Sequence, residues 1–241
     1  AEQIAVDEVG WLPLYVPQPP KFYRIVLQPN HDRLLVGGDL AIIGEGRDTT
    51  TLRFTAQTTA AGKNYSAFFV PGGVNFQIAD LRLEEDLHQP VEQFEFMGVF
   101  YEPSAADTVC TVESVDIDGF THCLYSPSSG NDSSDGELFL TVRDCDLHPW
   151  WTFCIGLWTV PGGHKRLHLY DSYLHDNQNG HLVYTHPHNS VHVENTRFDG
   201  ASSWAFHFQG TEVAGDPEYQ RFIGCWFGPR NTQGLITQDR A

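Results

Sequence analysis

The chain has 241 residues, 41% of them hydrophobic, and a formal net charge of −17 from 14 Lys and Arg residues against 31 Asp and Glu residues. An aromatic content of 13% is too high for a disordered acidic chain, and no apolar stretch reaches the roughly 18 residues of a membrane helix, so we expect one globular domain. So negative a surface repels a phosphate backbone, and neither nucleic acid nor a membrane is expected as a partner.

The first 33 residues differ from the rest of the chain. They carry five prolines, at positions 13, 17, 19, 20 and 29. The chain opens at Ala1, which is what removal of a secretion signal after a small residue would leave, and a start set by cloning is the alternative. We therefore expect a secreted or cell-surface protein.

One pattern recurs six times from residue 76 onward. Two apolar positions lie two residues apart, a small or turn-forming residue follows, and a large apolar residue comes soon after. The six segments are Phe76–Leu83, Cys110–Ile117, Leu140–Leu147, Leu167–Leu174, Val191–Phe198 and Gln220–Phe227, and Leu40–Gly44 begins in the same way before departing from it. Alternation with a period of two predicts short strands, and the Asp, Asn, Ser or Gly that follows predicts a bend with left-handed dihedrals.

A further apolar triplet follows most of these segments and predicts another strand. The triplets are Leu124–Ser126, Ile155–Leu157, Val183–Thr185, Phe206–Phe208 and Ile236–Gln238, with the first and third residues of each expected to point inward. The sequence therefore predicts an all-β fold, a single-stranded right-handed parallel β-helix of about seven coils with three short strands per coil. A βα solenoid is disfavoured because helical periodicity is absent. A β-sandwich is disfavoured because it gives no reason for equivalent residues to align from one repeat to the next.

The segment Leu40–Leu52, together with turns that read like Val191–Phe198, resembles the pectin-lyase-like superfamily of right-handed parallel β-helices. The likeness covers residues 34–241 and indicates no particular subfamily. Members of this superfamily usually have a helical cap at the amino end, and residues 1–33 are interpreted as a non-helical substitute. The architecture serves lyases, glycosidases, epimerases, phage tail proteins and adhesins, so the resemblance is specific for fold and not for activity.

Aligning the coils also predicts which outward side chains are neighbours, because equivalent residues of stacked strands lie about 4.8 Å apart. The column after the large apolar position contains Glu84, Asp118, His148, His175 and Asp199. Beside it we expect Arg143, Asp146, Tyr170, Tyr173, Glu194 and Arg197. These are candidate general acids, bases and carboxylate-neutralising groups, although outward positions of a solenoid are polar in any case. Two imidazoles about 5 Å apart should resist double protonation, so at least one is expected to have a pKa below 6.5.

A second outward row lies on the strands formed by the triplets. It contains Tyr125, Trp158, Tyr184 and His207, and the imidazoles of His168 and His192 lie on the first strand of each coil. Exposed rings in a row can stack on sugars, so these residues are candidate substrate contacts; a ladder of rings that only stabilises the coils is the structural alternative.

The segment Tyr184–His188 and the loop at residues 131–136 suggest a catalytic motif or a cation site. The segment Tyr184–His188 is similar to a motif of mannuronan C5-epimerases, from which only Tyr184 and His188 carry over, because the spacing is one residue shorter and His186 replaces an aspartate. His186 and His188, with His192 close behind, could instead bind zinc or copper. Ca²⁺ would help so acidic a chain to approach a polyanion, and residues 131–136 are rich in oxygen ligands without the spacing of an EF-hand.

Together these features predict a secreted protein that binds, and cleaves or modifies, an extracellular polysaccharide. A uronate lyase or epimerase would use Arg143 or Arg197 to neutralise the sugar carboxylate and one of Tyr170, Tyr173, His148 and His175 to remove the C5 proton. An inverting hydrolase would use two of the carboxylates of Asp116, Asp118, Asp146 and Asp199. The alternative is a non-catalytic module, such as an adhesin, a wall-associated spacer or a phage tail fragment. A monomer is expected for an enzyme and a trimer for a tail protein.

Overall fold

The computed structural model describes residues 2–5, 21–27, 33–56, 63–85, 94–103, 106–127, 136–159, 164–210 and 220–238. Within these ranges the chain forms strands, bends and turns but no helix, and so no helix that could cross a membrane. Every pair of neighbouring strands is parallel. The fold is a parallel β-solenoid, which confirms the predicted fold class.

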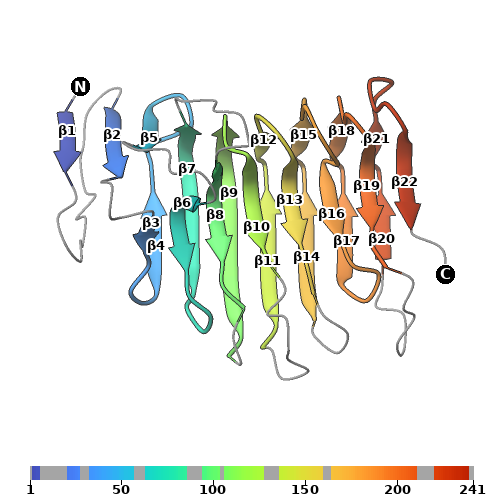
Figure 1. Cartoon of the computed structure of the whole chain (residues 1–241), viewed down its shortest axis with the longest axis horizontal. Coiled ribbons are helices and arrows are strands. Elements are labelled where there is room, and N and C mark those ends of the chain that lie inside the picture. The colour runs from blue at the N-terminus through green and yellow to red at the C-terminus, as the bar shows by residue number, and fades with distance from the viewer. Residues whose placement is uncertain are drawn as a thin grey trace.

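The strands form two long sheets that run along the axis of the solenoid (Figure 1). The 14-stranded sheet contains β1 (Glu2–Ala5), β2 (Lys21–Leu27), β4 (Leu40–Ile43), β5 (Thr50–Ala56), β7 (Phe76–Glu85), β9 (Thr108–Asp118), β11 (Leu138–Arg143), β12 (Asp146–His148), β14 (Lys165–Tyr170), β15 (Tyr173–His175), β17 (Ser190–Glu194), β18 (Arg197–Asp199), β20 (Gln220–Ile223) and β21 (Trp226–Phe227). The eight-stranded sheet contains β3 (Arg33–Leu35), β6 (Lys63–Val70), β8 (Phe94–Tyr101), β10 (His122–Ser126), β13 (Phe153–Leu157), β16 (Val183–Thr185), β19 (Trp204–Phe208) and β22 (Gly234–Gln238).

The bend column takes the left-handed conformation that its residue types predict. Its members have φ between 49° and 62° and are Asp80, Ser114, Asp144, Asp171, Asn195 and Gly224. This bend changes the phase of the alternation: Val142 and Cys145 are three residues apart, yet both are buried. In an uninterrupted strand they would point to opposite faces. The left-handed residue therefore lets one apolar core continue through the corner of every coil.

The register between coils agrees with the columns predicted from the repeat. Val142 pairs with Val112 and Leu169, and Val193 pairs with Leu169 and Phe222. The triplets also pair as expected on the eight-stranded sheet. Three strands per coil are present from β11 onward, whereas β7 and β9 continue through the bend as single strands.

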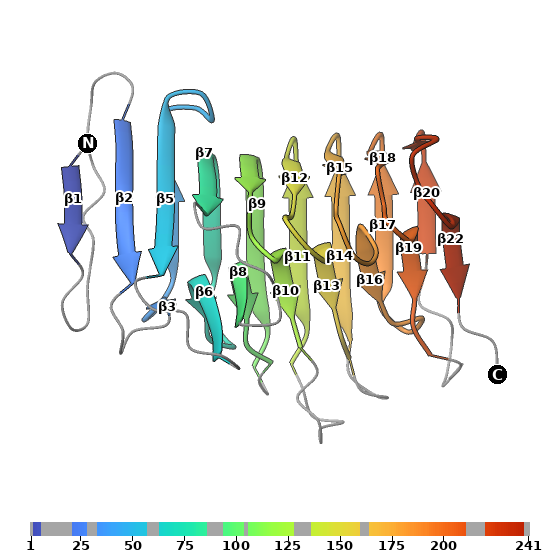
Figure 2. The same cartoon turned by 45° about the horizontal axis from the view of Figure 1, so that its top comes forward.

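The solenoid has about five turns, compared with the seven expected. The turns are least uniform toward the amino end, where β4 and β5 pair with separate halves of β7 and a loop at residues 44–49 replaces the bend. The proline-rich segment interpreted as a cap lies mostly outside the described residues. Its described parts, β1 and β2, extend the 14-stranded sheet, so β1 and β22 lie at opposite ends of the stack (Figure 2).

We expect Val193→Asp to prevent folding. Val193 has 0% of its surface exposed and lies in a column that is apolar on both sides, so an aspartate there would be a buried carboxylate without a partner, at a cost of several kcal/mol. His192→Asp, one residue earlier on the outward side of β17, is the matched control and should melt close to the parent chain. Thermal unfolding followed by circular dichroism checks both. Equal melting temperatures for the two variants would contradict the inward assignment of this column.

A buried histidine makes the fold sensitive to acid. His122 is 4% exposed, and its ring nitrogens lie 3.2 Å from the Thr121 hydroxyl and 3.0 Å from the Thr152 hydroxyl. Burial disfavours the imidazolium and lowers the pKa of His122 from 6.5 to about 3. Below its pKa of about 6.5 the unfolded chain binds this proton and the folded chain does not, so the free energy of unfolding falls as the pH drops toward about 3.

We expect His122→Gln, which keeps a donor and an acceptor, to reduce this loss of stability. The measurement is the urea midpoint at about pH 7 and about pH 4.5, which should differ less in the variant than in the parent chain. His192→Gln, which removes a partly exposed imidazole, should leave the difference unchanged. If His122→Gln and the parent chain show the same dependence on pH, His122 is not the group responsible.

Candidate functional site

The predicted column of polar residues runs along one edge of the 14-stranded sheet. Strand pairing places Asp118 beside both Glu84 and His148, and His175 beside Asp199. The imidazole rings of His148 and His175 stack at 4.9 Å between centroids with an angle of 16°. The structure therefore brings the two histidines together as the sequence predicts, on β12 and β15.

His148 lies between two carboxylates and a guanidinium group. Its Nδ1 is 3.1 Å from Asp118 Oδ1 and its Nε2 is 3.4 Å from Asp116 Oδ1. Arg82 donates a hydrogen bond of 2.7 Å to Asp118 and lies 3.2 Å from Glu84, which also pairs with Arg53. An alternating network of charges thus approaches His148 from the amino-terminal side.

His175 is held by a carboxylate at each ring nitrogen. Its Nε2 lies 2.7 Å from Asp146 Oδ1 and its Nδ1 lies 2.8 Å from Asp176 Oδ2. Burial opposes the charged form, but the hydrogen bonds and the charges of Asp146 and Asp176 outweigh it and raise the pKa of His175 above 6.5. The sequence predicts a lowered pKa for at least one of the two histidines, and His175 is not that residue, because Asp146 and Asp176 outweigh the effect of its burial.

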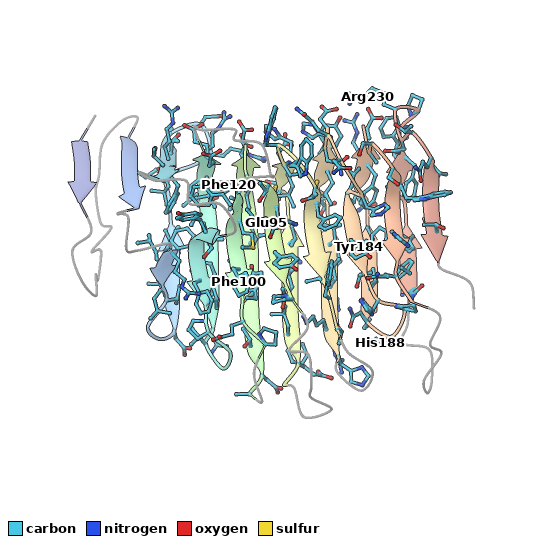
Figure 3. All side chains as sticks on the ribbon, in the orientation of Figure 1. Glu95, Phe100, Phe120, Tyr184, His188 and Arg230 are labelled. Carbon is cyan, nitrogen blue, oxygen red and sulfur yellow. The ribbon has the colours of Figure 1, made fainter. Side chains whose placement is uncertain are left out.

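Asp199 is not an open carboxylate at the end of this column. It is 6% exposed, and Arg230 covers it with hydrogen bonds from Nε to Oδ2 at 2.6 Å and from the backbone N–H to Oδ1 at 3.1 Å. Arg230 also donates through Nη1 to Asp176 at 2.5 Å. Figure 3 shows Arg230 at the upper edge of the solenoid, where it closes the charge network on the carboxyl-terminal side.

Two arginines beside the column lie over aromatic rings. Arg143 has its Cζ 5.2 Å from the centre of the Tyr170 ring, and Arg197 has its Cζ 4.8 Å from Tyr173 and 5.0 Å from Trp226. Both arginines are exposed. Within the described residues neither guanidinium group forms an ion pair with a carboxylate. These two cations are therefore accessible to an external anion.

The remaining predicted residues of this sheet surround Tyr170. The His192 ring lies 5.7 Å from the Tyr170 ring and 6.0 Å from the His168 ring, and His192 Nε2 is 3.4 Å from Glu194. Burial, followed by the charges of His192 and Arg166, lowers the pKa of His168. This group is polar and aromatic, as expected of a substrate-contacting surface, and lies before the bend rather than after it.

The aromatic row on the eight-stranded sheet is more enclosed than the sequence predicts. Tyr184 is only 8% exposed, because its ring stacks on Phe153 at 5.0 Å and on His181 at 5.3 Å and meets His207 edge-on. Trp158 lies 5.5 Å from Tyr184, and Tyr125 lies 6.3 Å from Trp158. Burial, with the charges of Glu95 and Tyr184, raises the pKa of Tyr125 to about 12. The row packs as a ladder that joins coils, and Tyr184 has little ring surface left for a sugar.

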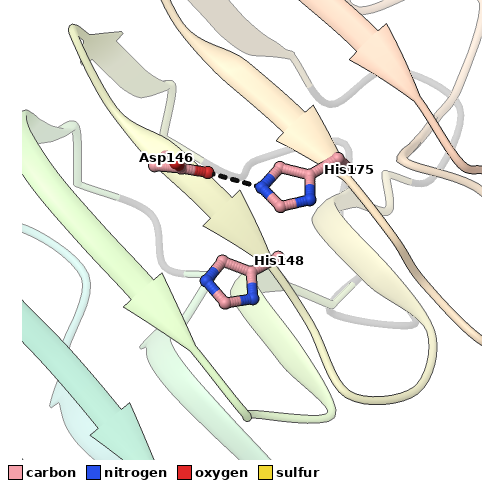
Figure 4. A group of neighbouring side chains, drawn as sticks. All are labelled: Asp146, His148 and His175. Carbon is pink, nitrogen blue, oxygen red and sulfur yellow. Dashed lines mark hydrogen bonds and ion pairs between the residues drawn. The ribbon is translucent and has the colours of Figure 1, made fainter. Parts of the chain in front are cut away.

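One cluster could hold a metal ion. Asp146, His148 and His175 each offer a ligand atom within 4.8 Å of the others (Figure 4), and in the described part of the chain no other such group of His, Cys, Asp or Glu is present. The rings of His186 and His188 lie 5.5 Å apart, and His188 lies at the lower edge of the solenoid, opposite Arg230 (Figure 3). The oxygen-rich segment considered for Ca²⁺ lies, apart from Gly136, outside the described residues.

Sequence reasoning missed four members of this network. Arg53 is the register partner of Glu84 and so continues the histidine column back by one coil. Arg82 occupies the same outward row as Asp116 and Asp146, so extending that row back by one coil would have found it. Asp176 directly follows the histidine column and has a φ of 55°. Arg230 comes from the turn after β21 and belongs to no column, so no repeat signal could have placed it.

Comparisons of the chain with models of protein families, with curated proteins and with solved structures gave no match.

Proposed function

We propose that this chain is a secreted member of the pectin-lyase-like superfamily that binds an anionic polysaccharide and modifies it by lyase or epimerase chemistry. The observation that carries the proposal is the pair of exposed guanidinium groups, Arg143 and Arg197, which lie over tyrosine rings without a carboxylate partner in the described structure. Guanidinium groups bind planar carboxylates through paired hydrogen bonds. A polyuronate carries one such carboxylate on every sugar residue. The tyrosine ring beside each cation holds the guanidinium group in place by cation–π attraction.

Arg197 and Tyr173 form the most complete reaction site. Arg197 would neutralise the carboxylate of one uronate, which makes the hydrogen on its C5 easier to remove. Tyr173, stacked at 4.1 Å on His175, would first lose its phenolic proton to solvent and would then, as the phenolate, take the C5 proton. In the lyase reaction the C4–O bond then breaks, a C4–C5 double bond forms, and Tyr173 gives the proton to the leaving oxygen. In the epimerase reaction a water molecule on the opposite face reprotonates C5, and the hydroxide that remains is neutralised by the proton released from Tyr173.

The two histidines are given a positioning role in this proposal. Both nitrogens of His175 already face carboxylates, and His148 contacts one carboxylate with each nitrogen. A base needs a free lone pair directed at the substrate, so Tyr173 is the better base. A glycoside hydrolase is less well supported, because Asp118 pairs with Arg82 and Asp199 is covered by Arg230.

A non-catalytic carbohydrate-binding module is the second candidate. This candidate is favoured by the pairing of the histidines and aspartates with one another and with arginines. Acids and bases that are paired in this way can line a surface that binds a polysaccharide without converting it. Both candidates predict binding to polyuronates, and only the first predicts a product. A panel of polyuronates and neutral polysaccharides, assayed for binding, for the ultraviolet absorbance of unsaturated products, for new reducing ends and for epimer composition by NMR, distinguishes them.

We expect Arg197→Gln to weaken polyuronate binding about 10- to 100-fold, since hydrogen bonds between charged groups are worth roughly 1.5–3 kcal/mol. Arg33→Gln is the matched control, because Arg33 also lies over an aromatic ring, Phe69 at 4.2 Å, but on the eight-stranded sheet. Calorimetric titration with a uronate oligosaccharide measures both. Equal losses in the two variants would place binding elsewhere.

We expect Tyr173→Phe to keep polyuronate binding and to abolish turnover. The substitution retains the ring that stacks on His175 and lies under Arg197, and it removes only the phenolic oxygen. Binding is measured by the same titration and turnover by the product assays. Full activity in the variant would show that Tyr173 is not the base, and absence of product in the parent chain with intact binding would favour the non-catalytic module.

A further inference from the structure

His148 and His175 are oriented in the same way by their surroundings. Each directs Nδ1 at a carboxylate, Asp118 at 3.1 Å for His148 and Asp176 at 2.8 Å for His175. An arginine from another part of the chain anchors each of these carboxylates, Arg82 for Asp118 and Arg230 for Asp176. Carboxylates that accept a hydrogen bond from one nitrogen of an imidazole commonly orient the other nitrogen toward a metal ion.

The Nε2 atom of each histidine contacts one carboxylate, and these two carboxylates are neighbours. His175 Nε2 lies 2.7 Å from Asp146 and His148 Nε2 lies 3.4 Å from Asp116, and these two aspartates are register partners on β12 and β9. Figure 4 shows the ring of His148 beside the contact between Asp146 and His175. Two imidazoles and the Asp146 carboxylate thus offer ligand atoms within 4.8 Å of one another, and Asp116 contacts His148 from the next strand.

The cluster carries more negative than positive charge. Six carboxylates, those of Glu84, Asp116, Asp118, Asp146, Asp176 and Asp199, share three guanidinium groups, those of Arg53, Arg82 and Arg230. Asp116 Oδ1 is itself buried and accepts no hydrogen bond from the described residues. Neighbouring carboxylates on stacked strands repel each other, and a divalent cation between them would remove that repulsion.

We propose that this cluster binds one divalent transition-metal ion through Nε2 of His148, Nε2 of His175 and a carboxylate oxygen of Asp146, with Asp116 as an additional oxygen ligand. Two imidazoles and a carboxylate suit Zn²⁺ and its neighbours in the first transition row, whereas Ca²⁺ and Mg²⁺ prefer oxygen ligands alone. Asp118 and Asp176 would be positioning residues that hold the imidazoles. The inference does not depend on the proposed polysaccharide, because it concerns only these side chains.

The test is a titration of the full, chelator-treated chain with Zn²⁺ followed by calorimetry, with Co²⁺ absorption as a readout of the ligand field. We expect one ion per chain. His175→Gln and Asp146→Asn should each weaken Zn²⁺ binding at least tenfold, and Asp176→Asn should weaken it about 10- to 100-fold. The double variant His186→Gln/His188→Gln and the single variant His192→Gln are matched controls and should bind Zn²⁺ like the parent chain.

A second measurement covers variants that fail to fold. In the parent chain, Zn²⁺ should shift the imidazole NMR signals of His148 and His175 and leave that of His192 in place. Absence of Zn²⁺ binding by the parent chain would overturn the proposal. So would loss of binding in the His186→Gln/His188→Gln variant together with unshifted signals of His148 and His175.

Discussion

The fold depends on a left-handed residue at the same place in successive coils. Strand alternation alone would turn the apolar positions outward after each corner, and a residue with φ near 50° restores them to the inside. The bends also contact one another: the Ser114 hydroxyl donates to Asp144 at 3.0 Å, and the Asn195 amide donates to Asp171 at 3.2 Å. A short polar side chain can adopt this conformation and reach the bend of the neighbouring coil, which explains why this column contains Asp, Asn and Ser.

In-register stacking also determines the chemistry of the outer surface. Once the inward columns are aligned, each outward residue lies about 4.8 Å from its counterparts in the neighbouring coils, whether or not the two attract. The Asp116–Asp146 pair is an unfavourable consequence of this constraint, and the His148–His175 stack is another. The chain compensates with Arg82 from the preceding coil of the same row and with Arg230 from a turn outside the columns. The same constraint therefore brings together carboxylates that repel one another. In our proposal a bound cation reduces this repulsion.

The two sheets use their outward rings differently. On the eight-stranded sheet, Tyr184 is enclosed by Phe153, His181 and His207, so its contribution is to the cohesion of the coils. On the 14-stranded sheet, Tyr173 is sandwiched between Arg197 and the imidazole of His175, where the rings hold a cation that remains exposed. Position in a column does not distinguish these cases. Exposure of the neighbouring arginine does distinguish them, and for this reason we propose the 14-stranded sheet as the functional surface.

The sequence alone determined the solenoid, its inward columns, its bend residues and the residues that stack beside His148 and His175 in their column, because each depends on alternation and on local dihedral preference, which repeat with every coil. Only the tertiary structure decided what those side chains contact. The burial of Asp199 and the anchoring of Asp176 both follow from Arg230, which lies 31 and 54 residues away in a turn without a repeat signal. The raised pKa of His175 likewise depends on how its ring is rotated between Asp146 and Asp176. Column position gives a side chain its neighbours, but its rotamer and the ions that reach it from loops are set by packing between distant parts of the chain.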